Sequence, residues 1–480
     1  MQTYKNLING EWVGASDGAV FETRNPAKSS EALGVFPSAT RDDARRAIES
    51  AQAAFPKWAG LPAPARGAIL DKASQIIAAR FDDIAACLTR EEGKTLAESK
   101  GEVTRARDLF RYYGAEGWHM GGDVLPANTT DTLLYTRREP LGVISVVTPW
   151  NFPLAIPAWK IAPALIYGNT VVFKPASWAP QTALMLVEAL VDAGLPAGVV
   201  NYVTGSGRTV GDEMVAHPAV KGITFTGSYA VGTGIYARAI QNLTRVQLEM
   251  GGKNPMVVLQ DADLNLAVDL AVRSGFGLTG QACTATSRVI VEQPIADRFA
   301  QALAEAARHL KVGNGLESGV QMGPAVSRDQ LETDLSYVEI GRQEGAKLLA
   351  GGGVAGDGGY VIQPTVFDHA EPTMSIAQEE IFGPVISLLR VKDLDEAIEK
   401  ANGIGFGLSA GIVTNDLHKA FAFANRIEAG VVKVNEPTTG LVLNAPFGGF
   451  KHSSANTFKE QGQAAIEFFT RTKTVYMKHG

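Results

Sequence analysis

Cys283 is the residue of this 480-residue chain best suited to act as a nucleophile. It lies in the small-residue segment GQACT, between a helical pattern and the strand-like run SRVIVE. A thiol in such a loop can attack an electrophilic carbon, although a small buried side chain is the commoner state of a cysteine. The second cysteine, Cys87 in the helical segment IAACLTR, fits that buried state. From these residues alone, the role of Cys283 stays open.

Two further polar side chains follow strand-like runs. Asn151 in TPWNFP comes after VISVV, and Glu249 lies near the end of VQLEM, which is followed by two glycines. Because α/β sheets bind ligands at the carboxyl ends of their strands, the Asn151 amide could hold an oxyanion and Glu249 could act as a general base. A helix-capping asparagine and an exposed loop carboxylate are the structural alternatives.

The segment FTGSYAVG could bind a phosphate. Gly227, Ser228 and Gly232 follow the run VKGITF and open a helical pattern, so their backbone N–H groups would face a pyrophosphate. The spacing is weaker than GxGxxG, and a plain tight turn is the alternative. The seven histidines are scattered and form no ligand-like cluster with cysteines, so we predict no metal site.

These residues need a sheet to position them. From 143 to 250, short β-branched runs alternate with helical patterns at 154–166, 181–193 and 208–217, and further helices are predicted at 42–55, 65–80 and 81–92. This rhythm indicates a parallel, dinucleotide-type sheet. It restarts after residue 252 with PMVVLQ, SRVIVE, VISLLRV, SAGIVTN and VVKVN, separated by predicted helices at 264–276, 295–310, 394–401 and 417–427. We therefore predict a second α/β domain.

Three segments lie outside this rhythm. The glycine-rich stretch 351–359 is predicted to be a surface loop, since no helix start follows it. The strand-like LLYTRRE near 133–139 and the C-terminal FFTRTKTVYM could pair with a neighbouring chain.

The composition of the chain limits the kinds of binding partner that we expect. The formal net charge is −6 and there is no long Lys/Arg run, so nucleic acid is not an expected partner. The most apolar stretch is interrupted by polar residues and prolines, so we expect no membrane span. Two cysteines leave no disulfide framework, which favours a reduced, cytoplasmic compartment. A small molecule is the expected partner.

Seven segments, TPWNFP, FKPAS, FTGS, LEMGGKNP, GQACT, EEIFGP and PFGGFK, occur in this order, and the whole chain resembles the aldehyde dehydrogenase superfamily. The resemblance implies an α/β fold with a Rossmann-type dinucleotide-binding domain at 1–118 and 140–250, and a catalytic α/β domain at 251–447. It also implies a small β oligomerisation element at 119–139 and 466–480, with assembly into homodimers or homotetramers.

The resemblance also gives roles to individual residues. Cys283 becomes the nucleophile, Glu249 the base, and Asn151 forms the oxyanion hole with the Cys283 backbone N–H. Lys174 would bind the adenosine ribose and Glu380 the nicotinamide ribose. Pro149 and Trp150 would line an adenosine-side pocket, and Phe382 would pack near the nicotinamide. The full cofactor set is Thr148, Pro149, Trp150, Lys174, Ser177, Thr226, Gly227, Ser228, Glu380 and Phe382.

Ser177 departs from the commonest NAD pattern of the family, in which a glutamate often follows KPA. A carboxylate there would repel the 2′-phosphate of NADP, whereas a serine removes that repulsion. We therefore expect the enzyme to accept NAD or NADP.

Within the superfamily, RARDLFRYYGAEG, GQACTATSR and NEPTTGLVLNAPFGGFK resemble the α-ketoglutaric semialdehyde (2,5-dioxopentanoate) dehydrogenases. Such a substrate carries a carboxylate, so Arg105 is the expected cation, with Trp159 and Phe447 as tunnel walls. An exposed helix arginine is the structural alternative. Succinic semialdehyde or a broad range of aldehydes remain alternative substrates. A non-catalytic relative is disfavoured because Cys283, Glu249 and Asn151 are all present.

Overall fold

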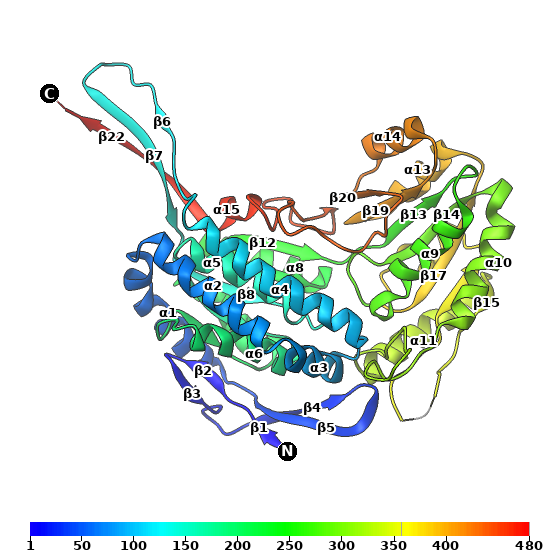
Figure 1. Ribbon diagram of the computed structural model, residues 1–480, viewed down its shortest axis with the longest axis horizontal. Coiled ribbons are helices and arrows are strands. Elements are labelled where there is room, and N and C mark those ends of the chain that lie inside the picture. The colour runs from blue at the N-terminus through cyan, green and yellow to red at the C-terminus, as the bar shows by residue number, and fades with distance from the viewer. Residues whose placement is uncertain (357, 480) are drawn as a thin grey trace.

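Two seven-stranded sheets account for most of the architecture. The computed structural model describes residues 1–356 and 358–479, and the two sheets lie side by side along its long axis (Figure 1). The α/β fold expected from the sequence is confirmed, because helices cover the faces of both sheets.

The first sheet has the strand order β12-β11-β8-β9-β10-β2-β3. Its parallel strands are those predicted from the apolar runs: β8 (Val143–Val147), β9 (Thr170–Lys174), β10 (Val200–Tyr202), β11 (Val220–Gly227) and β12 (Arg245–Met250). Nearly continuous burial explains why most residues of these runs are apolar and why the runs do not alternate strictly between apolar and polar residues. The sheet edge, β2 (Asn6–Ile8) and β3 (Glu11–Val13), is antiparallel and was not predicted.

The strand order changes direction between β8 and β11. The chain adds β9 and β10 on one side of β8, then β11 and β12 on the other. Ligands of open α/β sheets bind at the carboxyl ends of the strands at such a switch point. The segments that leave β8 and β11 there are 148–151 and 226–228, both predicted as site residues.

The helices around the first sheet match the predicted ones. Helix α3 (Phe81–Glu92) has the predicted bounds, and the ends are shifted in α1 (Arg41–Ala59), α2 (Ala63–Ala79), α5 (Ala155–Ile166) and α6 (Pro180–Asp192). The predicted helix at 208–217 is instead a π-helical turn, Gly207–Gly211, followed by α7 (Asp212–Ala216). The Ser206 carbonyl accepts both the Val210 and Gly211 N–H groups, which widens this turn.

Helix α4 (Leu96–Glu116) is the longest helix and packs against α2, α3 and α5. Thr95 caps its first turn in a reciprocal arrangement with Glu98, which fixes where the helix starts. Helix α8 (Tyr229–Ala239) begins directly after β11, with Ser228 as its N-cap residue.

The second sheet has the order β15-β16-β17-β14-β13-β19-β20. Its predicted strands are β13 (Asn254–Val258), β14 (Thr286–Glu292), β17 (Val385–Val391), β19 (Ser409–Val413) and β20 (Val431–Val434). Predicted helices α9 (Leu264–Gly275), α10 (Gln293–His309), α13 (Leu394–Asn402) and α14 (Leu417–Arg426) pack on it. Strands β15 (Lys347–Ala350) and β16 (Thr365–Asp368) and helices α11 (Arg328–Gln343) and α12 (Ser375–Gln378) were not predicted.

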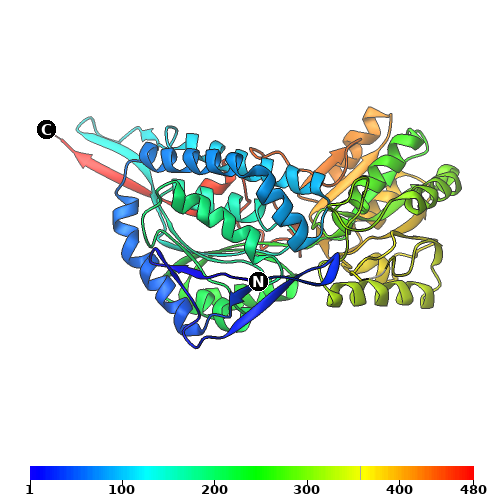
Figure 2. The ribbon, with the colours of Figure 1, turned by 60° about the horizontal axis from the view of Figure 1, so that its bottom comes forward.

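A ribbon of three strands projects from the body at the end opposite the second sheet (Figures 1 and 2). It consists of β6 (Val124–Leu125), β7 (Thr132–Pro140) and β22 (Thr470–Lys478). Within the chain, the segments LLYTRRE and FFTRTKTVYM pair antiparallel with each other, from Thr470 opposite Pro140 to Lys478 opposite Thr132. Their pairing with a neighbouring chain stays a prediction. The predicted C-terminal strand also starts late, because Phe468 and Phe469 end α15 (Ala464–Phe469).

The N-terminal strands β1 (Gln2–Thr3), β4 (Val20–Asn25) and β5 (Lys28–Pro37) form a further three-stranded sheet, and β18 (Phe406–Gly407) pairs with β21 (Phe450–Lys451). Position 357 of the predicted 351–359 loop and position 480 of the C-terminal element lie outside the described residues. Among the described helices, none combines the length and the apolar character that a membrane crossing requires.

Candidate active site

Cys283 lies where two cavities meet. One cavity has a volume of about 240 Å³ and the other about 370 Å³, and Cys283 lines both. The first opens on the switch point of the first sheet, and the second is lined by one face of α4. A thiol in this position can contact two different molecules at once, one from each side.

The first cavity collects most of the predicted cofactor residues. Its walls include Pro149, Trp150, Asn151, Thr226, Gly227, Ser228, Glu380 and Phe382, together with Met250, Gly251 and Gln330, which were not predicted. The Trp150 and Phe382 rings pack edge to face, with centroids 5.4 Å apart. Pro149 and Trp150, expected on the adenosine side, therefore lie in the same cavity as Cys283 and Phe382.

The residues around the switch point fit a dinucleotide. The buried hydroxyls of Thr148 and Thr226 have no hydrogen-bond partner within 1–356 and 358–479, so both can bind a ligand. Lys174 ends β9 with its Nζ donating to the Pro175 carbonyl at 3.0 Å, and burial lowers its pKa to about 8. Ser177 lies exposed three residues further on.

Glu380 reaches the first cavity from the loop after α12. Its Oε1 accepts the Gly252 N–H at 3.0 Å, and burial raises its pKa to about 7. A Cβ atom at Gly251 would overlap the Glu380 carboxylate, so a larger residue there would displace this carboxylate from its place beside Gly252. Phe382, two residues on, has a left-handed backbone with φ +60°, which turns its ring toward Trp150.

The Cys283 loop has an unusual backbone. Leu278, Thr279 and Gly280 have φ values of 55°, 60° and 68°, a left-handed run that costs free energy at the two non-glycine positions. Burial, and next the carboxylates of Glu380 and Glu249, raise the pKa of the half-buried Cys283 thiol to about 12. The resting thiol is therefore protonated at neutral pH and needs a base before it can attack.

Asn151 is buried and bonded to the Cys283 loop. Its Nδ2 donates to the Gln281 carbonyl at 2.9 Å, two residues before the cysteine. An amide nitrogen carries two hydrogens, so one remains for a ligand. The structure thus brings Asn151 and Cys283 together as the walls of one cavity.

Glu249, near the end of β12, is the third predicted catalytic residue, and its carboxylate contacts the segment 449–454. Its Oε2 accepts the Gly449 N–H at 3.2 Å and its Oε1 accepts the Ser454 hydroxyl at 3.4 Å. Burial and repulsion from Glu460 raise its pKa well above the usual value, against the opposing effect of Lys459 and Lys160. Among the described residues that line the two cavities, Glu249 is absent, so its side chain must rotate to reach a water beside Cys283.

The second cavity contains the predicted substrate residues Arg105 and Trp159. The Arg105 guanidinium lies 5.7 Å from the Trp159 ring centre and donates to the Leu441 carbonyl and to Gln461 Oε1. Burial lowers the pKa of Arg105 to about 10, so it is still a cation at neutral pH. The third predicted residue, Phe447, packs against Trp159 with centroids 6.0 Å apart.

The sequence did not identify several walls of the second cavity: Glu98, Gly101, Glu102, Phe152, Ala155, Leu278, Thr284, Thr439, Gly440 and Leu441. Glu98, Glu102 and Arg105 recur at the three-to-four spacing of one helix face, and that periodicity is a signal that could have found the two acids. The loop residues 439–441 carry no such signal.

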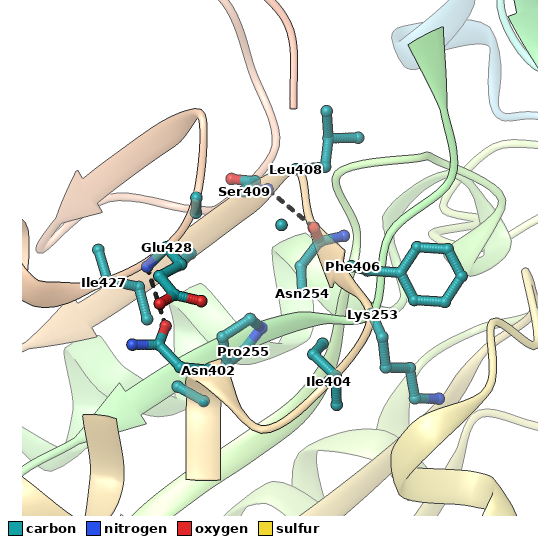
Figure 3. Close-up of a pocket in the computed structure, with 14 residues that line it drawn as sticks. Lys253, Asn254, Pro255, Asn402, Ile404, Phe406, Leu408, Ser409, Ile427 and Glu428 are labelled. Carbon is teal, nitrogen blue, oxygen red and sulfur yellow. Dashed lines mark hydrogen bonds between the residues drawn. The ribbon is translucent and has the colours of Figure 1, made fainter. Parts of the chain in front are cut away.

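A separate, smaller cavity lies near Lys253, between β13 and the 401–410 segment (Figure 3). Its volume of about 10 Å³ suits a single water molecule. Asn254 Oδ1 accepts the Ser409 N–H across it, and the Lys253 side chain runs away from Glu428 (Figure 3). Burial and then Arg288 lower the pKa of Lys253 to about 7. This cavity is too small for a substrate.

Across residues 1–356 and 358–479, His, Cys, Asp and Glu side chains form no group that could hold a metal ion.

Known proteins resemble the chain over almost its whole length. It is 47% identical to an α-ketoglutaric semialdehyde dehydrogenase from Bacillus subtilis, covering 99% of this chain and 98% of that protein. It is also 47% identical to an α-ketoglutarate semialdehyde dehydrogenase from Haloferax volcanii, with 98% of each covered.

Solved structures share the fold. The NAD⁺ complex of an aldehyde dehydrogenase from Bacillus cereus superposes with a TM-score of 0.96 at 36% identity, covering 99% of this chain and 97% of that one. The model of the aldehyde dehydrogenase family matches residues 12–475. This chain therefore belongs to the aldehyde dehydrogenase family.

Proposed function

We propose that this protein oxidises α-ketoglutaric semialdehyde to 2-oxoglutarate with NAD or NADP, through a thioester on Cys283. The observation that carries the proposal is the position of Cys283 in the walls of two cavities, one fitted for a dinucleotide and one containing a buried cation. Both reactants can then meet at one sulfur atom.

The residues supply the covalent chemistry. An aldehyde gives up hydride readily only after a nucleophile has made its carbon tetrahedral. Cys283 does this as a thiolate, after its proton has passed to a water molecule. The Asn151 amide and the Cys283 backbone N–H hold the developing alkoxide, an interaction worth about 3–4 kcal/mol per donor in other oxyanion holes. A nicotinamide bound in the first cavity supplies the hydride acceptor, and the product left on Cys283 is a thioester.

Glu249 acts as the base. A carboxylate whose pKa is raised by burial accepts a proton more readily than an ordinary one, which suits it to activate a water against the thioester. Hydrolysis releases the acid and frees the thiol. Because a base is present next to the thiol loop, hydrolysis rather than transfer of the acyl group to coenzyme A is the proposed outcome.

The substrate assignment rests on charge as well as on the names of the relatives. α-Ketoglutaric semialdehyde carries a carboxylate at the end remote from its aldehyde, and Arg105 offers a planar, partly desolvated cation in the second cavity. Succinic semialdehyde carries the same charge on a shorter chain and is the second candidate.

The cofactor assignment includes NADP because Ser177 is uncharged. Lys174 and Thr226 are proposed to bind the adenosine and nicotinamide halves, with Glu380 at the nicotinamide ribose. The absence of a carboxylate side chain at position 177 leaves room for a 2′-phosphate.

We further propose a homodimer or homotetramer in the cytoplasm. Strand β22 lies at the edge of the three-stranded ribbon with Tyr476 and Met477 exposed, and an open apolar edge favours association. The two free cysteines are consistent with a reducing compartment. Sedimentation of the purified protein tests the assembly, and a monomer would contradict it.

Steady-state kinetics with a panel of aldehydes and both cofactors tests the function. We expect the highest kcat/KM with α-ketoglutaric semialdehyde, a lower value with succinic semialdehyde, and a much lower value with an uncharged aldehyde of equal length. A preference for the uncharged aldehyde would contradict the substrate assignment, and the lack of cofactor reduction with every aldehyde would contradict the activity itself.

A further inference from the structure

One face of α4 reaches three separate loops of the active site. Glu98, Glu102 and Arg105 lie at i, i+4 and i+7 on this helix and therefore share a face. Glu98 Oε1 accepts the Leu278 N–H of the cysteine loop at 2.7 Å, and Arg105 donates to the Leu441 carbonyl. Glu102 bonds to the loop that carries Asn151, as described next.

Lys94, just before the helix, is fully buried and bonded to the Asn151 backbone. Its Nζ donates to the Asn151 carbonyl at 2.6 Å and to Glu102 Oε2 at 2.7 Å, and it lies 4.4 Å from the centre of the Phe152 ring. Burial disfavours the ammonium form, but the carboxylates of Glu102 and Glu92 outweigh it and raise the pKa of Lys94. The Lys94 side chain therefore stays a charged ammonium group although it is buried.

Glu102 completes the attachment from the other side. Its Oε1 accepts the N–H groups of Leu154 and Ala155 at 2.9 and 3.0 Å, where α5 begins. The Lys94–Glu102 pair thus bonds both ends of the segment 151–155. A segment held at its first carbonyl and its last two amides has little freedom to shift the Asn151 side chain.

A gain in folding stability does not by itself explain why the Lys94–Glu102 ion pair is buried. Removing two charges from water costs several kcal/mol, and a buried ion pair is often no more stabilising than well-packed apolar residues. The attachment of the Asn151 loop gives the pair a different role. A displacement of about 1 Å in a catalytic group can reduce a rate by about a hundredfold.

We infer that Lys94 and Glu102 are positioning residues that fix the Asn151 amide against Cys283, while Glu98 holds the cysteine loop from the same helix face. The inference rests on the proposed oxyanion role of Asn151. It extends the reactive centre to residues that touch neither the substrate carbon nor the sulfur.

The test is a double-mutant cycle between Lys94→Met and Asn151→Ala, read as the rate of the first burst of reduced nicotinamide. Lys94→Met should lower that rate by about ten- to a hundredfold, because the amide is misplaced. In the Asn151→Ala background the same change should add less than about twofold, because the residue through which Lys94 acts is already lost. Cofactor KM should stay unchanged in Lys94→Met.

Two controls separate positioning from general damage. Alkylation of Cys283 by iodoacetamide needs the thiol but no oxyanion hole, so its rate should be the same in Lys94→Met as in the parent. Lys100→Met removes a lysine from the exposed side of the same helix, where it pairs with Asp82, and should leave the burst unchanged.

If Lys94→Met does not fold, Glu102→Gln replaces it, since the amide oxygen can still accept from Leu154 and Ala155 while the charge pair is broken. We expect the same pattern in the cycle with Asn151→Ala. The inference would be overturned if the rate loss of the double variant equalled the product of the losses of the two single variants. It would also be overturned if the folded Lys94→Met or Glu102→Gln variant gave a burst as fast as that of the parent protein. If Asn151→Ala itself leaves the burst unaffected, the oxyanion role fails, and the inference fails with it.

Discussion

The two cavities that meet at Cys283 are built in different ways. The first is lined by residues that directly follow the strands of the first sheet or precede its helices, such as Trp150, Thr226 and Ser228. The second is lined by a helix face that carries Glu98 and Arg105, and by the remote loop at 439–441. The first cavity therefore follows only in part from local sequence, since Glu380 and Phe382 complete it from a distant segment. The second depends mainly on contacts between segments far apart in the chain.

This difference explains why the chemistry is easier to assign than the substrate. Dinucleotide binding at a switch point follows from the strand order and from short motifs. The surroundings of Arg105 depend on Leu441 and Gln461, which lie 336 and 356 residues further along the chain. Mutations that affect only one of the two cavities can test whether cofactor binding and substrate recognition are separate in this way.

Loss of Cys283 should have the largest effect, because this residue belongs to both cavities. We expect Cys283→Ala to abolish dehydrogenase activity with every aldehyde and either cofactor, measured as formation of reduced nicotinamide. Cys87→Ala is the matched control and should stay largely active, since its sulfur only contacts Thr182 Oγ1 at 3.8 Å and burial raises its pKa. Comparable losses of activity in the two variants would contradict the assignment of Cys283, rather than Cys87, as the nucleophile.

Loss of Glu249 should separate the two halves of the reaction. Hydride transfer precedes the step that needs the base, so Glu249→Gln should give one burst of reduced nicotinamide per active site and almost no further turnover. Stopped-flow absorbance measures the burst. Without a burst, Glu249 would also be needed to deprotonate Cys283, which the high thiol pKa makes chemically reasonable.

Arg105→Ala should affect the second cavity alone. A partly desolvated charge-assisted pair contributes about 1.5–3 kcal/mol, so kcat/KM for a carboxylated semialdehyde should fall about ten- to a hundredfold. An uncharged aldehyde of similar length should lose little. Equal losses for both substrates would point to a packing defect around Leu441, and no loss for either would exclude Arg105 as the carboxylate ligand.

Ser177→Glu should produce the smallest effect and should be confined to cofactor binding. The new carboxylate would repel the 2′-phosphate, so the KM for NADP should rise far more than the KM for NAD. The kinetics of the semialdehyde at saturating NAD should be unchanged. If both cofactor KM values change equally, the side chain at 177 does not face the 2′ position.

Much of the fold could be predicted because its parallel strands are buried on both faces. VISVV and VISLLRV are mostly apolar and become β8 and β17. Helix α11 was missed because only Asp334, Val338 and Gly341 are buried along it, which leaves almost no apolar stripe to detect. Gln330, a residue of this helix that lines the first cavity, was missed for the same reason.

Other features depend on pairing that a single sequence does not reveal. The partner of the C-terminal strand is β7, more than 300 residues earlier, so the sequence indicated a strand without identifying its neighbour. Lys94 and Glu102 were missed for a similar reason. Their function depends on Asn151 and Leu154, and nothing in the segment EEGKTLAESKGE points to those contacts.

Mass spectrometry of Glu249→Gln, mixed with α-ketoglutaric semialdehyde and NAD⁺, tests the covalent route most directly. We predict one added acyl group per chain, located on the peptide that contains Cys283 and formed in step with one equivalent of reduced nicotinamide. The Cys283→Ala/Glu249→Gln double variant should acquire no adduct. Reduced nicotinamide without any acyl group on Cys283, or an adduct on Cys87 instead, would contradict the covalent mechanism.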